Sequence, residues 1–284
     1  TQLLPVINNS NPLELYIGNR NLLPEYEHDL HFNWMLFDQF SFTSFFAGLN
    51  ASYTHDKINW SRSVNDDLIQ VLTLINVPDD YRASMNLDFS TPVRKLGINV
   101  NLKANESWNR GINFVNDVKN INTNLNHELT FSIDNRKKDK WDADLGGGAQ
   151  LSNALYSVDQ SMNNRYFNVS AFADIKYTPN QHWFFSLSAD LTNYNAKSFT
   201  QSVFIPLLKA EASRYILKNN RGVITFNAFD ILDKNAGIDR YSELNYLRET
   251  QSNIIGRYVM LSFKYRINKF DNGNGGLNVE VNKR

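Results

Sequence analysis

The chain has 284 residues, and its 29 Lys and Arg residues balance 29 Asp and Glu residues, which leaves no electrostatic footprint for nucleic acid. Cysteine is absent, which excludes disulfide bonds and thiolate metal sites. No run approaches about 18 consecutive apolar residues, so we expect no transmembrane helix. The negative mean hydropathy is compatible with a membrane barrel, because only alternate residues of its strands face lipid.

The first 24 residues are punctuated by Pro5, Pro12, Gly18 and Pro24. Proline and glycine at this density predict a loop, so residues 1–24 are expected to be a loop segment. The chain begins at Thr1, without an initiator methionine or the charged and apolar regions of a signal peptide. We therefore expect either a processed protein or a piece of a longer one.

From residue 26 onward, apolar and polar residues alternate with period two, which predicts strands with one apolar and one polar face. The stretch 70–89 contains Pro78 and is expected to be bent or bulged there. In the stretch 200–217, Pro206 interrupts the alternation, so its faces are not assigned. The pattern predicts about 11 strands, over residues 26–36, 41–60, 70–89, 96–105, 124–134, 141–152, 167–177, 183–192, 200–217, 224–228 and 253–270.

The predicted connections are of two kinds that alternate along the chain. Short turns are expected near residues 38, 92, 137, 179 and 220, and longer polar loops near residues 65, 117, 160, 198 and 240. Outer-membrane barrels show this asymmetry, with short periplasmic turns and longer outer loops. Strand residues 25–270 would then form one barrel domain, followed by a polar tail at 271–284.

Three features favour a membrane barrel over a β-sandwich or a soluble barrel, which remain the alternatives. The polar face is polar along whole strands, and the apolar strings hold five or six positions, enough to cross roughly 25 Å of lipid. Aromatic residues gather at the strand ends, as in interfacial girdles. They are Trp34, Phe37, Phe40, Phe89, Trp141, Tyr177 and Trp183 near the turns, and Trp108, Tyr156, Tyr166 and Tyr194 near the loops.

Three segments resemble TonB-dependent receptors. The segment NNSNPLELYIGNRNLLPE is similar to one that precedes mid-barrel strands in that family, at Gly18, Asn19, Leu22 or Leu23, Pro24 and Glu25, with Arg20 in place of the usual proline. The segments FNAFDILDKNAGIDR and IIGRYVMLSFKYRINKF resemble the closing segments of the Bacteroidetes outer-membrane β-barrel branch. The matching positions there are Phe226, Asp230, Leu232, Gly256, Arg257, Tyr258, Leu261 and Tyr265.

This resemblance implies an all-β, antiparallel transmembrane barrel in the cell outer membrane, of which the chain is the C-terminal half of 22 strands. It implies four partners: the lipid bilayer, the N-terminal barrel half and plug of the same parent protein, the TonB complex acting through that plug, and the barrel assembly machinery. The last strand would close the barrel, with Lys264 and Arg266 toward the lumen. Phe270 fits the terminal aromatic assembly signal, although 14 residues follow it. The residues expected to face lipid are Val259, Leu261, Phe263, Tyr265 and Ile267.

Residue types that could support chemistry are interpreted as wall or loop residues. The histidines are His28, His31, His55, His127 and His182. His28 and His31 fall on opposite faces of one strand, so they do not make a shared metal site. His127 is the candidate for an outer-membrane hydrolase, which needs Ser, His and Asn on the barrel exterior. We expect no enzyme, no cofactor and no catalytic, cofactor-binding or metal-binding residues.

The carboxylate pairs Asp142 and Asp144, Asp66 and Asp67, and Asp79 and Asp80 could bind Ca²⁺ or act as acid and base, but solvated lumen or loop charge is the favoured interpretation. Residues 146–148 are glycines that would allow close approach or curvature within a strand. Tyr241 and Tyr246 are candidate contacts to a substrate in the outer loops.

The function expected from these observations is the barrel portion of a TonB-dependent receptor, forming the wall and outer loops for uptake of a bulky nutrient such as a siderophore, a glycan or a peptide. The alternatives are a non-energised surface barrel for adhesion or assembly, and a soluble β-sandwich binding module.

Overall fold

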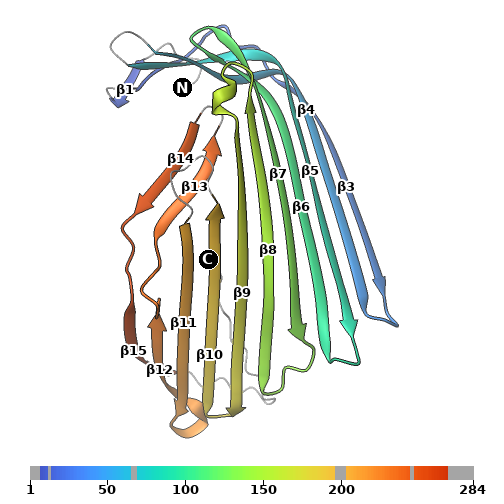
Figure 1. Cartoon of the computed structure of the whole chain (residues 1–284), viewed down its shortest axis with the longest axis vertical. Helices are drawn as coiled ribbons and strands as arrows, with labels where there is room; N and C mark the ends of the chain where they lie inside the picture. The colour runs from blue at the N-terminus through green and yellow to red at the C-terminus, as the bar shows by residue number, and fades with distance from the viewer. Residues whose placement is uncertain (1–6, 12–13, 65–68, 196–202, 244–245, 268–284) are drawn as a thin grey trace.

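The computed structural model describes residues 7–11, 14–64, 69–195, 203–243 and 246–267. Figure 1 shows a broad, curved sheet of long strands, with the hairpin β13–β14 beside it. The sheet has 13 strands, of which β1 (Ile7–Asn11) and β2 (Glu14–Ile17) are short and the other eleven form what we call the wall. The wall strands are β3 (Tyr26–Asp38), β4 (Thr43–Val64), β5 (Gln70–Val93), β6 (Ile98–Val115), β7 (Val118–Asn135), β8 (Trp141–Tyr156), β9 (Asn164–Asn180), β10 (Trp183–Asn195), β11 (Val203–Ile216), β12 (Gly222–Phe229) and β15 (Tyr258–Tyr265).

The wall confirms the predicted all-β, antiparallel architecture. Each wall strand pairs antiparallel with the next one along the chain, and β12 pairs with β15. The eleven wall strands correspond one to one to the predicted strands. The described residues also contain two 3₁₀ turns, η1 (Gln160–Met162) and η2 (Lys218–Asn220). Among the described residues, no helix is long and apolar enough to cross a membrane.

The strand register assigns every wall residue to one of two faces. Partners that lie directly opposite in the ladders share a face, so the apolar set of one strand continues into the apolar set of the next. Leu129 of β7, for example, lies opposite Ala104 on one side and Ala149 on the other. We call the two sides the apolar face and the polar face.

The register also assigns the faces of β11, which the sequence pattern left open. Pro206 lies opposite Leu191 and therefore belongs to the apolar face, whereas Leu207 lies opposite Asp190 on the polar face. The β11–β12 ladder begins only at Ala210. Because no β12 residue pairs with position 206, the missing N–H of proline interrupts no ladder on that side.

Several predicted boundaries are wrong. The N-terminal 24 residues contain β1 and β2, and β2 pairs in parallel with the start of β5. The turn predicted at 91–94 lies at 94–97, where Gly97 has φ of +66°. The loop predicted near residue 117 is a two-residue turn, and both Asn116 and Asp117 have positive φ, as the tight turns of twisted hairpins require.

The C-terminal part differs most from expectation. The polar connection predicted between residues 231 and 252 contains the hairpin β13 (Gly237–Glu243) and β14 (Tyr246–Ser252). The closing strand predicted at 253–270 is shorter, because residues 253–257 precede β15 and it ends at Tyr265. Phe270 and the tail 271–284 lie outside the described residues, as do Asp66 and Asp67.

The predicted irregularity at Pro78 is a change of neighbours without an inserted residue. His55 pairs with Asp79 and Lys57 with Val77, so the register continues past Pro78. On the turn side of Pro78, β5 lies between β4 and β6, up to the pair of Tyr81 with Arg110. On the loop side of Pro78, β4 pairs with β6 instead, and β5 pairs with β2.

Candidate functional site

The apolar face of the wall is exposed. Leu129, Phe131 and Leu187 expose 51%, 50% and 44% of their surface, and Leu261 exposes 72%. A soluble domain buries its apolar strand faces, since large exposed apolar areas are rare on monomers. This face extends from β3 to β15 and has the composition of a lipid-facing belt.

The polar face holds the buried polar residues of the described wall. Side chains on the concave side of a curved sheet converge, so they lose more contact with solvent than those on the convex side. Four of the six buried apolar side chains of the described wall also lie on this face, namely Leu72, Leu74, Ala154 and Tyr156. The polar face is therefore the concave, inner side, and the apolar face is the outer side. The buried polar side chains on this face are Thr54, Asp80, Asn113, Asn120, Asn122, Ser152, Asn164 and Ser213.

Aromatic rings meet on the apolar face toward both ends of the strands. At the turn end, the Trp141 and Tyr177 rings stack with centroids 4.1 Å apart, and the Trp183 and Phe185 rings stack at 5.6 Å. Trp34 packs edge-on against Phe45 at 5.5 Å. These contacts fit the predicted turn-end girdle, except that Phe37 lies on the polar face.

At the loop end, a different set of rings forms the aromatic row. Tyr53 lies 5.1 Å from Tyr81, and Tyr81 lies 6.4 Å from Trp108, on three neighbouring strands. His28 stacks on Tyr53. Of the predicted loop-end girdle only Trp108 belongs to this face. The predicted members that lie on the polar face are Tyr156, Tyr166 and Tyr194.

Two neighbouring rows of polar side chains cross the inner face from β3 to β9, and we call them the polar track. Each row follows directly opposed residues from strand to strand. The first row is His31, Asn50, Ser84, Ser107, Asn126, Ser152 and Tyr166, and the second is Asp29, Ser52, Arg82, Asn109, Asn124, Ala154 and Asn164.

Hydrogen bonds connect several members of the track. The imidazole Nδ1 of His31 lies 2.8 Å from Asn50 Oδ1. Asn124 donates to Asn109 at 3.1 Å, and Asn126 donates to Ser107 at 3.3 Å. The β3–β6 part of the track lines a groove of about 310 Å³, a volume at the lower end for small-ligand pockets.

Three buried polar side chains at the loop end of this face have atoms without a hydrogen-bond partner among the described residues. They are Asn122 Oδ1, Ser152 Oγ and both polar atoms of Asn164. All three residues expose 4% or less of their surface. A buried polar group without a partner costs about 1–3 kcal/mol, so such groups in a native protein call for a ligand or water.

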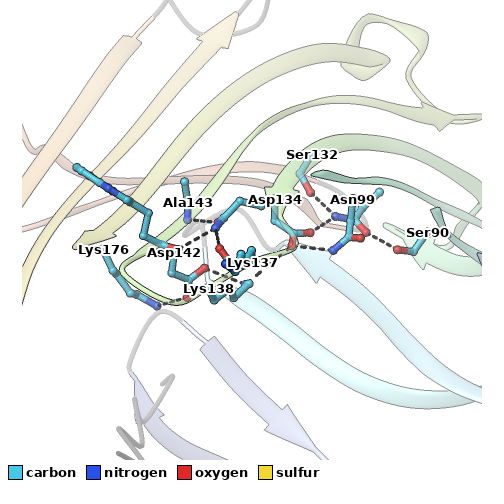
Figure 2. A network of polar contacts seen from close by, with 12 residues as sticks. Ser90, Asn99, Ser132, Asp134, Lys137, Lys138, Asp142, Ala143 and Lys176 are labelled. Atoms are coloured by element: carbon cyan, nitrogen blue, oxygen red, sulfur yellow. Dashed lines mark hydrogen bonds and ion pairs between the residues drawn. The ribbon is translucent and has the colours of Figure 1, made fainter. Parts of the chain in front are cut away.

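The polar face at the turn end carries a network of carboxylates and amides (Figure 2). Asp134 accepts hydrogen bonds from Asn99 at 3.0 Å and from Asn101 at 2.9 Å. Ser90 donates to Asn101 at 2.7 Å, which extends the network to β5. Because Asp134 is held by neutral amides on a neighbouring strand, the network fixes side chains at the β6–β7 boundary.

Asp142 is held by two cations. Lys138 approaches it at 2.8 Å and Lys176 at 4.0 Å. Figure 2 shows both lysines around this carboxylate. The hydrogen bond to Asp142 raises the pKa of Lys138, which lies in the turn between β7 and β8. Asp144 shares the polar face with Asp142, as predicted. Among the described residues, no group of three His, Asp or Glu side chains could hold a metal ion.

The histidines lie in separate environments. His28 and His31 are on opposite faces of β3, as predicted. His127 is on the apolar face, hydrogen-bonded through Nδ1 to Glu106 directly across on β6. The residue directly opposite His127 on β8 is Leu151. Sequence reasoning missed the Glu106 pairing, which the alternating pattern could have signalled as two polar residues on an apolar face.

The glycines at 146–148 allow close approach. A Cβ on Gly146 would lie 2.5 Å from the Phe172 ring, and one on Gly147 would lie 2.9 Å from the carbonyl oxygen of Ser170. The prediction of close packing at these glycines is therefore confirmed, and Phe172 lies over the space that a side chain at 146 would fill.

The N-terminal segment that resembles receptor sequences anchors the bent β4–β5 hairpin. Asn19 donates to the carbonyl of Leu74 at 2.9 Å. The carboxylate of Glu25 accepts from the backbone N–H of Ile58 at 2.5 Å and pairs with Lys57 at 3.1 Å. These residues therefore fix the hairpin where β4 and β5 change neighbours.

The C-terminal matching positions shape the connection after β12. Asp230 is completely buried, has φ of +48°, and accepts from the backbone N–H groups of Lys234 and Asn235. Arg257 donates its N–H to Asp233 at 3.1 Å. The side chains of Tyr241 and Tyr246 lie outside the described part of the chain.

Residues 1–117 match the model of the outer membrane protein beta-barrel family. This match indicates an outer-membrane location, and the exposed apolar belt agrees with it. The match and the exposed belt together support a β-barrel protein in the outer membrane, and the described sheet is open. No curated protein and no solved structure matches the chain.

Proposed function

We propose that this barrel section forms the wall of a TonB-dependent receptor that takes up a bulky nutrient, such as a siderophore, a glycan or a peptide. The observation that carries the proposal is the broad polar inner face across eleven strands. Barrels with few strands are filled by their own side chains, whereas 22-stranded outer-membrane transporters enclose a lumen wide enough for a plug. A wide polar wall suits such a lumen.

The direction of the two edge strands supports a larger barrel. Within the described sheet, β3 pairs only with β4, and β15 pairs only with β12. Unpaired strand edges are not viable in lipid, because their N–H and C=O groups have no partners. With eleven antiparallel strands, β3 and β15 run in the same direction. An antiparallel closure therefore requires an odd number of further strands, and eleven more would give 22.

The same proposal names the partners that this chain would have in the cell. Further strands and a plug would come from the parent protein, and the TonB complex of the inner membrane would act on that plug. The barrel assembly machinery would insert the wall into the outer membrane. We assign the chain itself no enzymatic role. A hydrolase centred on His127 would lose activity when His127 is replaced, and we expect no activity to lose.

The test is uptake by cells that carry the complete protein. Labelled siderophores, oligosaccharides and peptides are supplied to cells with and without the gene, and the transported compound is then followed in cells lacking TonB. The proposal predicts that uptake stops without TonB or after the proton gradient is collapsed. Uptake that continues unchanged in both conditions would contradict it.

A non-energised surface barrel for adhesion or assembly is the second candidate. It predicts a barrel without a plug domain and without any TonB-dependent phenotype. The third alternative, a soluble β-sandwich module, conflicts with the half-exposed apolar face of the wall, which a sandwich would bury against a second sheet.

A further inference from the structure

The polar track provides almost only neutral hydrogen-bonding groups. Among its residues, Asp29 and Arg82 carry charge and His31 can acquire it, and all three lie at the β3–β5 end. From β6 to β9 the rows consist of amides, hydroxyls and one alanine. Amide and hydroxyl side chains both donate and accept hydrogen bonds, which suits ligand groups that also do both.

The track is long and narrow. Neighbouring strands lie about 4.8 Å apart, so the six steps from β3 to β9 span about 29 Å along the inner face. Its width is two rows, separated by two residues along each strand. An extended ligand lying across the strands would meet a new pair of polar side chains at every step.

The buried part of the track retains hydrogen-bonding capacity. Ser152 and Asn164 are buried track members whose side-chain polar atoms have no hydrogen-bond partner in the described part of the chain, and Asn122 lies beside them on β7. Each exposes 4% or less of its surface. A water that bridges these buried atoms to a ligand hydroxyl would complete these hydrogen bonds. The groove over β3–β6 is the accessible start of the same rows.

We propose that the polar track binds an extended, uncharged and hydroxyl-rich ligand, an oligosaccharide. This inference rests on the proposed uptake function and narrows its substrate class. An anionic ferric chelate would require several cations, and the track contains Arg82 alone besides His31. Peptides with charged ends or side chains would need counter-charges on the β6–β9 part, where the rows have none.

The test uses the complete outer-membrane protein, purified in detergent. Binding is measured on an array of neutral and acidic oligosaccharides, uncharged and charged hexapeptides, and ferric siderophores. Calorimetry then gives the affinity for the best ligand. The test variant is Asn109→Ala with Asn124→Ala, because removing both partners of one hydrogen bond leaves no unpaired group. The control is Thr123→Ala, the neighbouring residue on the opposite face of β7.

A neutral oligosaccharide is expected to be the best ligand, with affinity reduced about tenfold in the double variant and unchanged in the control. Folding of each variant is checked by heat-modifiable migration in gels. Binding of only acidic glycans, peptides or chelates would overturn the inference, as would equal affinity in the double variant and the wild type. The binding measurement does not depend on TonB. If the protein binds an oligosaccharide but cells show no energised uptake, the transport proposal is contradicted and the binding inference stands.

Discussion

Asp56 and Pro78 lie opposite each other on β4 and β5, at the level where the two strands exchange neighbours. Asp56 has φ of +51°, and Pro78 has no N–H to contribute to the ladder. The two residues thus interrupt the pairing without changing the register. Past this level the outer end of β5 lies beside β2 and the outer end of β4 lies beside β6, instead of continuing the straight wall.

The strained backbone at Asp56 gives the first prediction. Asp56→Val places a β-branched side chain at positive φ and is expected to lower the free energy of unfolding of the complete protein by about 1–3 kcal/mol. Asp56→Gly should be neutral or slightly stabilising, because glycine adopts this conformation freely. Denaturant midpoints in detergent measure both. Equal midpoints for the two variants would show that the conformation at 56 carries no strain.

Glu25 gives the second prediction. Glu25→Ala removes the acceptor for the Ile58 N–H and the partner of Lys57, and should cost about 1–3 kcal/mol. Limited proteolysis should then cut the β4–β5 hairpin faster than in the wild type. Glu27→Ala is the control, since Glu27 is exposed on β3. If both variants are cut at the same rate as wild type, the anchoring role is wrong.

Asp159 provides a pH prediction outside the wall. Its pKa is lowered, first by the hydrogen bond from the Ser161 hydroxyl and then by that from the Ser161 backbone N–H. A lowered folded-state pKa means that the contact stabilises the loop above the unfolded pKa, near 4. This stabilisation is lost as the pH falls through the lower, folded-state value. Hydrogen exchange at the Ser161 amide should therefore accelerate, relative to neighbouring amides, as the pH falls below about 4. Asp159→Asn should abolish this dependence, and an unchanged profile in that variant would contradict the assignment.

The two faces of β10 give a matched pair of substitutions. Leu187→Arg places a charge on the lipid-facing belt and should destabilise the barrel by about 2–4 kcal/mol if it lies near the bilayer midplane. Ser188→Arg places the same side chain on the inner face, opposite Asp174 and Lys209, and should be tolerated. Outer-membrane levels of the two proteins are compared by immunoblot. Comparable loss of both variants would count against the assignment of faces.

Period-two alternation predicted the wall because successive residues of a strand point to opposite faces of the sheet, so odd and even positions separate the two faces. It identified all eleven wall strands and placed Leu261 and Phe263 on the apolar face, where the structure has them. Boundaries were less predictable, because the Asn116–Asp117 turn contains ordinary polar residues whose positive φ is visible only in the backbone. The hairpin β13–β14 lacks a clear apolar face, so the pattern indicated a loop.

The inner face could be predicted in composition but not in arrangement. The alternation identified Asn124 and Asn126 as polar-face residues, yet their alignment with Asn109 and Ser107 depends on the cross-strand register. The same parity should have excluded Tyr166 and Tyr194 from the outer girdle, since they alternate with Phe167 and Leu191.

The central claim is that the wall is apolar toward lipid and polar toward a water-filled lumen. The chain has no cysteine, so single cysteines can be placed along β10 at positions 185–192 without background labelling. In cells, a membrane-impermeant maleimide and a lipid-borne nitroxide quencher report water and lipid contact at each position. The account predicts lipid quenching at the odd positions and aqueous labelling at the even ones. Labelling at both parities, or no lipid quenching at the odd positions, would contradict it.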